Sequence, residues 1–308
     1  MIELIKSRPG LASAPNANLR VKAAALLELA RPSHVVKNGV VVVPWLLAGF
    51  EGSALAVVAT LLGFVLASVA VYAINDSMDA AVDAAHPKKR HRPIPSGRVS
   101  VPEALAFALL AATAAGSATA ILATDALAFV AVYLALNLFY SKVGKDIAVV
   151  DVAIVGAGFA LRFLAGLAAI GMLGELAWAA GPIFIASVGL AVGKRLAKKA
   201  TSAEKTDARV PRFYTPNVLT GLLILLSHLA VLAGAWAAFS ADADIAGRFS
   251  LAPPVIAILS LIGVGVLSRA VYLMTTDSVE PATVFTRDRP TLVAVALGAS
   301  ILGFNALV

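Results

Sequence analysis

Long apolar segments alternate with polar connections along almost the whole chain. Most of these segments are close to the length of about 20 residues with which a helix crosses a bilayer, and the first is the shortest. They cover residues 35–50, 54–74, 102–122, 125–141, 148–170, 176–193, 216–239, 252–273 and 291–307. Helices satisfy their own backbone hydrogen bonds in lipid, whereas single strands do not. The pattern therefore predicts an all-α fold, a polytopic membrane helix bundle of about nine transmembrane helices.

The composition supports a membrane protein over a soluble one. Hydrophobic residues make up 60% of the chain and charged residues only 14%, and the mean hydropathy is +0.89. A soluble domain usually contains about 25% charged residues. The chain has no cysteine, which excludes disulfides, zinc–thiolate sites and thiol nucleophiles. Membrane lipids are therefore its expected surroundings.

Basic residues are concentrated in alternate connections between the apolar segments. The long connections 75–101 and 194–215 are rich in Lys and Arg, whereas the opposite side has only Arg248. The positive-inside rule then predicts a multi-pass protein of the cytoplasmic (inner) membrane, with its N-terminus inside and its C-terminus outside. We expect the active site on the cytoplasmic side, where the long connections lie. No nucleic-acid-binding motif accompanies the net charge of +7, so an anionic partner other than nucleic acid is expected.

The N-terminal region differs from the rest of the chain. Its first 26 residues are mixed polar and Ala-rich, and they lack the apolar core and cleavage site of a signal peptide. We expect residues 1–26 to form a cytoplasmic tail and residues 27–308 to form one transmembrane catalytic domain. An interfacial helix is expected over residues 19–31.

A cluster of acids ends the second apolar segment. The stretch NDSMDAAVD contains Asp76, Asp79 and Asp83 at positions i, i+3 and i+7, so a helix would place them on one face. Their mutual repulsion would be relieved by a divalent cation, and Mg²⁺ prefers such oxygen ligands. Asn75 adds a side-chain amide at the same end of the helix. A solvated acidic face, balanced by the basic residues that follow, explains the spacing equally well.

A basic run follows these acids immediately. The stretch HPKKRHRP contains Lys88, Lys89, Arg90 and Arg92. Lys and Arg are the usual phosphate-binding residues, although a basic loop beside a membrane can also serve only to set the topology. Carboxylates for Mg²⁺ beside cations for phosphate together favour a site for a metal-bound diphosphate.

Other charged residues lie at the ends of later apolar segments. The stretch YSKVGKDIAVVD forms a second cluster of acids and bases, made up of Tyr140, Lys142, Lys145, Asp146 and Asp151. Arg162 lies inside an apolar segment, where an ionised group is costly, so it should either pair with a nearby Asp or bind a phosphate. For the basic pair of GKR at 193–195 and for the charged stretch TRDRP at 286–290, a solvated surface and a binding site are equally compatible with the sequence.

Together these residues resemble the UbiA-type membrane prenyltransferase superfamily. NDSMDAAVD matches its first aspartate motif, N-D-x-x-D-x-x-x-D, in full. Further similar stretches are RPSHVVKNGVVVVP (31–44), NDSMDAAVDAAHPKKRHRPIPSG (75–97), YSKVGKDIAVVDV (140–152), GFALRFLAG (158–166), GKR (193–195) and RDRP (287–290). The similarity extends from about residue 27 to the end of the sequence. Within the superfamily, the flanks are most similar to the branch that transfers phosphoribose to decaprenyl phosphate.

The resemblance implies a Mg²⁺-dependent phosphoribosyltransferase of cell-wall arabinan synthesis. It would move 5-phosphoribose from phosphoribosyl diphosphate to a polyprenyl (decaprenyl) phosphate. Asp76, Asp79 and Asp83 would be the catalytic residues, and together with Asn75 they would hold Mg²⁺. The residues that would bind the phosphates of donor and acceptor are Lys37, Asn38, Lys89, Arg90, Arg92, Tyr140, Lys145, Lys194 and Arg195.

Asp151 and Arg162 also belong to the substrate-binding site that the resemblance implies. Asp151 would either complete a second acidic site or orient Arg162. The sequence leaves open the chain length of the lipid and whether the protein forms a homo-oligomer.

Two alternatives use the same residues differently. An enzyme of the same fold could ionise a prenyl diphosphate and alkylate an aromatic acceptor, although only 7% of the residues are aromatic. A transporter could also place charges and glycines within its helices. Its charges would be expected near the middle of the membrane, whereas those of this chain gather at one side.

Overall fold

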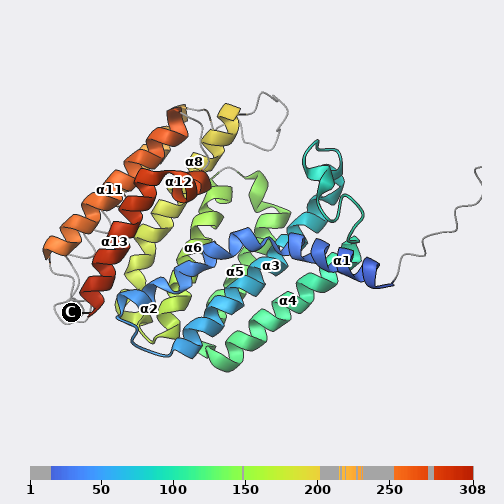
Figure 1. Ribbon diagram of the computed structural model, residues 1–308, viewed down its shortest axis with the longest axis horizontal. Coiled ribbons are helices and arrows are strands. Elements are labelled where there is room, and N and C mark those ends of the chain that lie inside the picture. Colours follow the sequence, from blue (N-terminus) through green and yellow to red (C-terminus); the bar gives the residue numbers. More distant parts are fainter. Residues whose placement is uncertain are drawn as a thin grey trace, which may run out of the picture. The chain divides into compact units, whose positions relative to one another are not determined.

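The computed structural model describes residues 15–147, 149–201, 253–276 and 281–307, and most of residues 215–231. All regular elements in these ranges are helices, which confirms the predicted all-α fold (Figure 1). The α-helices are α1 (Pro15–Ala30), α2 (Val43–Leu47), α3 (Ala54–Ala84), α4 (Val101–Leu122), α5 (Leu127–Lys142), α6 (Val150–Ala169), α7 (Leu173–Leu176), α8 (Ala180–Thr201), α11 (Pro253–Thr276), α12 (Pro281–Arg287) and α13 (Arg289–Leu307). The 3₁₀ helices are η1 (Pro32–Val41), η2 (Lys89–His91), η3 (Thr124–Ala126), η4 (Gly144–Asp146) and η5 (Ala177–Ala179).

Five helical stretches of the described chain are long and apolar enough to cross a membrane. They are Ala54–Ala84, Val101–Leu122, Thr124–Lys142, Val150–Ala169 and Leu173–Arg195. Shorter apolar stretches occur in α11 and α13, at Leu261–Met274 and Arg289–Ile301. Half of the predicted span 216–239 lies outside the described residues, so the number of nine spans stays a prediction.

The first predicted span, residues 35–50, is wrong as a continuous helix. The structure has the 3₁₀ helix η1 there, followed by the five-residue helix α2. Pro44 stands in the first turn of α2, where its missing N–H is tolerated, but it cannot continue an α-helix from η1. A Cβ atom at Gly166 would collide with the carbonyl oxygen of Val41. This segment therefore packs against α6 at a distance that only glycine permits.

Two helices continue beyond their predicted ends, at residues 74 and 193. Helix α3 extends to Ala84 and α8 extends to Thr201. Charged residues that the hydropathy pattern assigned to connections therefore lie on helices. Their side chains have fixed directions along a helix axis, which matters for the site described below.

The chain divides into two compact units, which we describe separately. Unit 1 consists of Met1–His34 and Ser68–Ala111, and unit 2 consists of Val35–Ala67 and Ala112–Val308. Helices α3 and α4 contribute residues to both units.

In unit 1, two buried apolar residues and two ion pairs hold helix α1 in place. Ala25 and Leu29 are buried, four residues apart on one face of the helix. Lys22 forms an ion pair with Glu103 at the start of α4. A second ion pair joins Glu28 Oε2 to Arg98 Nη1 at 2.7 Å. The helix predicted over residues 19–31 is thus present.

Helix α6 lies at the centre of unit 2. It runs beside α8 (Figure 1), and a Cβ atom at Gly156 would lie 2.5 Å from Val188 Cγ2 of α8. A larger residue at position 156 would therefore separate the two helices. Two apolar clusters complete this packing. One surrounds Phe163 and Leu167, and the other joins α8 and α11 through Val192 and Met274.

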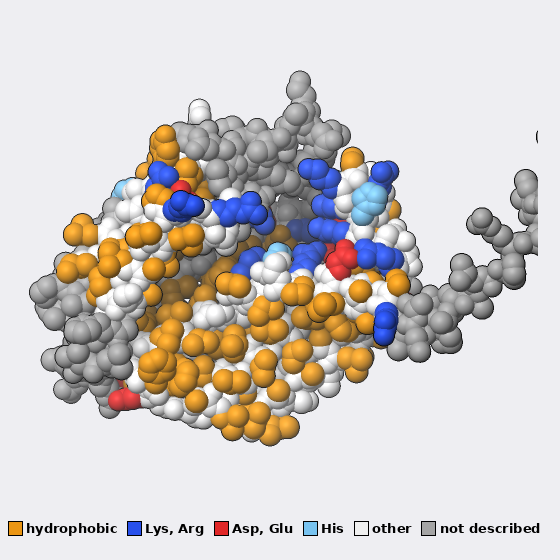
Figure 2. Space-filling model, in the orientation of Figure 1, with side chains coloured by type: hydrophobic (Ala, Val, Ile, Leu, Met, Phe, Trp, Pro, Cys, Tyr) orange, Lys and Arg blue, Asp and Glu red, His pale blue; other side chains and the backbone are white. Residues whose placement is uncertain are grey.

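Large apolar side chains remain exposed on the outside of the helices. Leu109 and Leu110 of α4 are 68% and 70% exposed. Figure 2 shows such hydrophobic side chains covering much of the visible surface below the charged region. Exposed apolar area on this scale is typical of a surface that contacts lipid.

Candidate active site

The predicted acidic residues lie on the last three turns of α3. Asp76 and Asp83 are seven residues apart, so they project from the same side of the helix, and they are 4% and 1% exposed. Asn75 and Asp79 are half-buried beside them. Acids this deeply buried require partners, because an isolated charge in a protein interior is strongly unfavourable.

Basic side chains of the loop after α3 supply part of the required positive charge. Arg92 Nη1 contacts both acids, at 2.7 Å from Asp83 Oδ2 and 3.3 Å from Asp76 Oδ1. Lys89 Nζ lies 3.3 Å from Asp83 Oδ1. In Figure 2, Lys and Arg side chains crowd around acidic side chains in this part of the surface. The structure therefore brings together two predicted acids and two predicted phosphate-binding residues.

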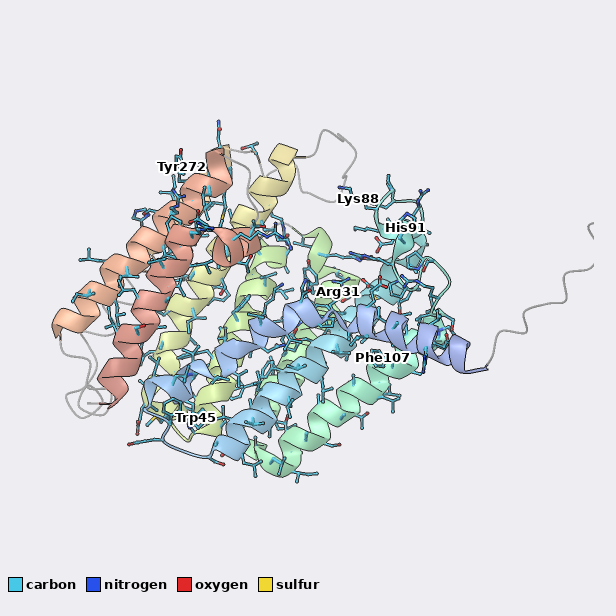
Figure 3. The ribbon with its side chains drawn as sticks, in the orientation of Figure 1. Arg31, Trp45, Lys88, His91, Phe107 and Tyr272 are labelled. Carbon is cyan, nitrogen blue, oxygen red and sulfur yellow. The ribbon has the colours of Figure 1, made fainter. Side chains whose placement is uncertain are left out.

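Arg31 is a member of this site that the sequence interpretation missed. Its Nη2 atom donates to Asp76 Oδ1 at 2.6 Å, and its guanidinium carbon lies 5.0 Å from the centroid of the Tyr72 ring. Figure 3 shows Arg31 where α1 ends. The signal in the sequence was the pair Arg31–Pro32, because a residue before proline seldom continues a helix. That signal locates the helix end, but it does not show which residue the arginine contacts.

The backbone of Arg31 adopts an unusual conformation. Its φ angle is +53°, a region that residues other than glycine rarely occupy. Such conformations are costly and occur mainly where the surrounding structure or function requires them. Here the conformation ends α1 and places the guanidinium at Asp76. We call Asp76, Asp83, Arg31, Lys89 and Arg92 the aspartate cluster.

The other basic residues of this loop contact different partners. Arg90 Nε donates to His91 Nε2 at 3.2 Å, and Lys88 is exposed; Figure 3 labels Lys88 and His91. Arg98 binds Glu28, and this hydrogen bond raises the pKa of Arg98 above its ordinary value. A role of Arg90 in phosphate binding stays a prediction.

The residues of the aspartate cluster fit a divalent cation that binds together with phosphate. Within the described ranges, no three His, Asp or Glu side chains are arranged to hold a metal ion by themselves. Asp83 Oδ1 is buried and accepts no hydrogen bond, and its contact with Lys89 Nζ at 3.3 Å is an ion pair only. Mg²⁺ usually takes one or two carboxylates and completes its shell with substrate phosphates and water. Two carboxylates, one of them with an oxygen that accepts no hydrogen bond, are suited to that arrangement.

In unit 2, Arg162 is buried in a cage of aromatic rings and neutral hydrogen-bond partners. Its Nε donates to Asn38 Oδ1 at 2.8 Å, Nη1 to the carbonyl oxygen of Gly158 at 2.7 Å, and Nη2 to the Tyr133 hydroxyl at 3.0 Å. The rings within cation–π distance belong to Phe64, Tyr133 and Phe159. We call this group the arginine cage. Its contacts join η1, α5 and α6, so we expect Arg162 to have a structural role.

Asp151 does not orient Arg162, contrary to one of the predicted roles. The two residues are separated by about three turns of α6, or about 16 Å along its axis. Asp151 Oδ2 instead accepts a hydrogen bond from Arg195 Nε of α8 at 2.9 Å. This ion pair joins α6 to α8. Arg195 is one of the residues that the sequence analysis assigned to phosphate binding.

The remaining predicted residues of unit 2 are distributed over several elements. Lys37 and Lys194 are exposed, Tyr140 and Lys145 are half-buried, and the neighbouring Asn38 is buried in the arginine cage. The side chain of Asp146 lies outside the described residues. The part of the site formed by these residues stays a prediction.

The TRDRP stretch contains a helix cap and a well-formed ion pair. Asp288 accepts two hydrogen bonds from Arg269, at 3.0 and 2.9 Å. It also accepts from the backbone N–H of Thr291 and so caps the start of α13. The bond from Arg269 lowers the pKa of Asp288 to about 2. Asp288 thus has a structural role, while Arg287 and Arg289 are exposed.

Comparisons with known proteins agree with this architecture. The model of the UbiA prenyltransferase family matches residues 39–289. A decaprenyl-phosphate phosphoribosyltransferase of Corynebacterium glutamicum is 33% identical over 256 residues, which cover 76% of this chain and 74% of that protein. The enzyme of the same name from Mycolicibacterium smegmatis is 34% identical over 233 residues, covering 70% of this chain and 71% of that protein.

A similar fold is found among solved structures. A UbiA homolog from Archaeoglobus fulgidus, bound to GPP and Mg²⁺, matches with a TM-score of 0.71. The match covers 92% of this chain and 100% of that chain at 19% sequence identity. At this identity the likeness shows a shared fold.

Proposed function

The chain belongs to the UbiA prenyltransferase family, and we propose that it transfers 5-phosphoribose from phosphoribosyl diphosphate to a polyprenyl phosphate. Its apolar helices and its family make it an integral membrane protein. The observation that carries the proposal is the similarity over most of the chain to two decaprenyl-phosphate phosphoribosyltransferases. The aspartate cluster supplies the chemistry that such a reaction requires.

The aspartate cluster would bind the diphosphate of the donor. Asp76 and Asp83, with Asp79 and Asn75 beside them, would hold Mg²⁺, which would neutralise charge on the diphosphate. Arg31, Lys89 and Arg92 are within reach of the same position. Their positive charges stabilise the diphosphate as it leaves the sugar.

The acceptor would attack without a strong general base. The bond between C1 of the ribose and the diphosphate breaks, and an oxygen of the polyprenyl phosphate forms a bond to the same carbon. A phosphate oxygen is already anionic near neutral pH, so no proton has to be removed from it. The lipid chain would lie along the apolar helices, and a decaprenyl chain would match the names of the relatives.

We place this reaction on the cytoplasmic side of the membrane. The basic connections of the sequence support this orientation, with the N-terminus inside and the C-terminus outside. Phosphoribosyl diphosphate is soluble and highly charged, so it should approach from that side. The product would then serve as a lipid-linked precursor for cell-wall arabinan.

Purified protein can test the donor directly. With Mg²⁺, radiolabelled phosphoribosyl diphosphate and decaprenyl phosphate, we expect label in the lipid phase after extraction and chromatography. The matched control is Arg20→Gln, which removes an exposed arginine of α1 that lies outside the aspartate cluster. Turnover of a prenyl diphosphate with an aromatic acceptor, without any lipid-linked phosphoribose, would contradict the proposal.

A further inference from the structure

Three basic side chains bind the same carboxylate oxygens that a divalent cation would need. Asp76 Oδ1 accepts from Arg31 at 2.6 Å and lies 3.3 Å from Arg92 Nη1. Asp83 has Arg92 at one oxygen, at 2.7 Å, and Lys89 at the other, at 3.3 Å. A cation that binds these acids must therefore share their oxygens with basic groups or replace them.

The charge of the cluster also opposes binding of a metal ion alone. Arg31, Lys89 and Arg92 outnumber the two buried acids, and counting the nearby Asp79 only brings the group to neutrality. A dication gains little attraction from a site without net negative charge. A bound diphosphate carries several negative charges, and it would change the sign of the local field.

The basic side chains are the partners that can move. The side chains of Arg31, Lys89 and Arg92 are 26%, 35% and 33% exposed. Those of Asp76 and Asp83 are only 6% and 1% exposed and are fixed on α3. The long basic side chains can therefore turn toward an arriving anion while the acids stay in place.

From these contacts we propose that the aspartate cluster binds metal ion and diphosphate interdependently, with Arg31 exchanging its partner between the two states. Without diphosphate, Arg31 binds Asp76 and competes with the metal ion. With diphosphate, Arg31 turns to a phosphate oxygen, and Asp76 is released to the metal ion. This inference rests on the proposed function only in assigning a diphosphate to the site. It adds that Arg31 opposes one ligand and supports the pair.

The coupling is measurable with Mn²⁺ and inorganic diphosphate on the full-length protein in detergent. Electron paramagnetic resonance reports bound Mn²⁺ while a chelating buffer fixes the free Mn²⁺ concentration. We expect diphosphate to tighten Mn²⁺ binding by a factor between about 5 and 150. Radiolabelled diphosphate should bind more tightly with Mn²⁺ by the same factor, because such coupling is reciprocal. Unchanged Mn²⁺ affinity on adding diphosphate would overturn the proposal.

The variant Arg31→Gln separates competition from simple damage. It should tighten Mn²⁺ binding in the absence of diphosphate and weaken it in its presence. Damage to the fold would weaken both, so opposite changes identify the exchange. Arg31→Lys, which keeps the charge, should retain more of the coupling. Weaker Mn²⁺ binding by Arg31→Gln in the absence of diphosphate, or equal changes in both conditions, would overturn the role of Arg31.

Arg20→Gln is the matched control for this experiment. It removes an exposed arginine from α1, the helix that ends next to Arg31, and this arginine lies outside the aspartate cluster. We expect both Mn²⁺ affinities to stay at the wild-type values, and a response like that of Arg31→Gln would contradict a specific role of Arg31. The result is independent of the donor, because phosphoribosyl and prenyl donors both release diphosphate. Failure of phosphoribosyl transfer and failure of the coupling are therefore separate outcomes.

Discussion

The aspartate cluster of unit 1 and the arginine cage of unit 2 use buried charge in opposite ways. In the cluster the acids are buried, and their basic partners are about one-quarter to one-third exposed. In the cage the cation itself is only 6% exposed, and the hydrogen-bond partners named above are neutral. Exposed partners can exchange when a ligand arrives, whereas an enclosed guanidinium cannot leave its cage cheaply. The cluster is therefore suited to binding, and the cage to holding helices together.

The largest effect is expected at Asp76, where binding and stability should separate. Asp76→Asn removes a charge that contacts Arg31 and Arg92 but keeps the shape of the side chain. We expect turnover to fall by about a thousandfold, because a charged group at the reacting phosphates is lost. The thermal unfolding temperature should change little, since both arginines can turn to water. Near-normal turnover by both Asp76→Asn and Asp79→Asn would remove these acids from the site.

The reverse result is expected at Arg162, where a substitution should lower the stability of the fold more than it lowers turnover. Arg162→Ala leaves a cavity among three aromatic rings and removes the donor to the buried amide of Asn38. We expect a loss of about 3 kcal/mol in the free energy of unfolding. Thermal unfolding in detergent would measure it. Full stability combined with a selective loss of substrate binding would show that Arg162 is a ligand after all.

A smaller change at Tyr133 should separate the two types of contact in the cage. Tyr133→Phe keeps the ring that lies 4.5 Å from the Arg162 guanidinium and removes the hydroxyl that accepts its hydrogen bond. We expect a loss of about 1 kcal/mol in the free energy of unfolding. Turnover at a temperature well below unfolding should stay near that of the wild type. A large loss of turnover would instead give the hydroxyl a role in the reaction.

The smallest effect is expected at the Arg269–Asp288 pair, which belongs to neither the aspartate cluster nor the arginine cage. The folded-state pKa of Asp288 is lowered from 3.8 to about 2 by its bond to Arg269. Its contribution to stability is therefore present above about pH 4 and lost as the pH falls toward 2. Asp288→Asn should flatten this part of the stability curve in a pH series of unfolding temperatures. An identical pH dependence in the variant would show that other groups dominate it.

Local patterns predicted much of the fold, every member of the aspartate cluster except Arg31, and the Arg162 and Asn38 members of the arginine cage. The spacing of Asp76 and Asp83 placed them on one face of a helix, and the structure confirms that arrangement. The helix over residues 35–50 was wrong because hydropathy does not register Pro44 or the close approach to Gly166. The ends of α3 and α8 were missed because charged residues on a helix resemble a connection in such a pattern.

Contacts between distant residues were beyond these patterns. Arg162 was identified as an unusual charge, but its partner Asn38 is 124 residues away in the sequence. Arg31 is 45 residues from Asp76, and no spacing rule connects them. Such pairs depend on the tertiary packing of whole helices. The sequence can therefore suggest the members of a charged site without showing which members meet.

Arg31 follows α1 directly and binds Asp76, and this contact has a practical consequence for the design of shortened versions of the protein. The family match begins at residue 39, so trimming the gene to the matched range would keep every aspartate of the cluster. It would nevertheless delete Arg31, together with the Glu28 and Lys22 side chains that fasten α1 to Arg98 and Glu103. A truncated protein of this kind could fold and still give misleading metal-binding data. The boundary for shortening should therefore lie before α1, at or before Pro15.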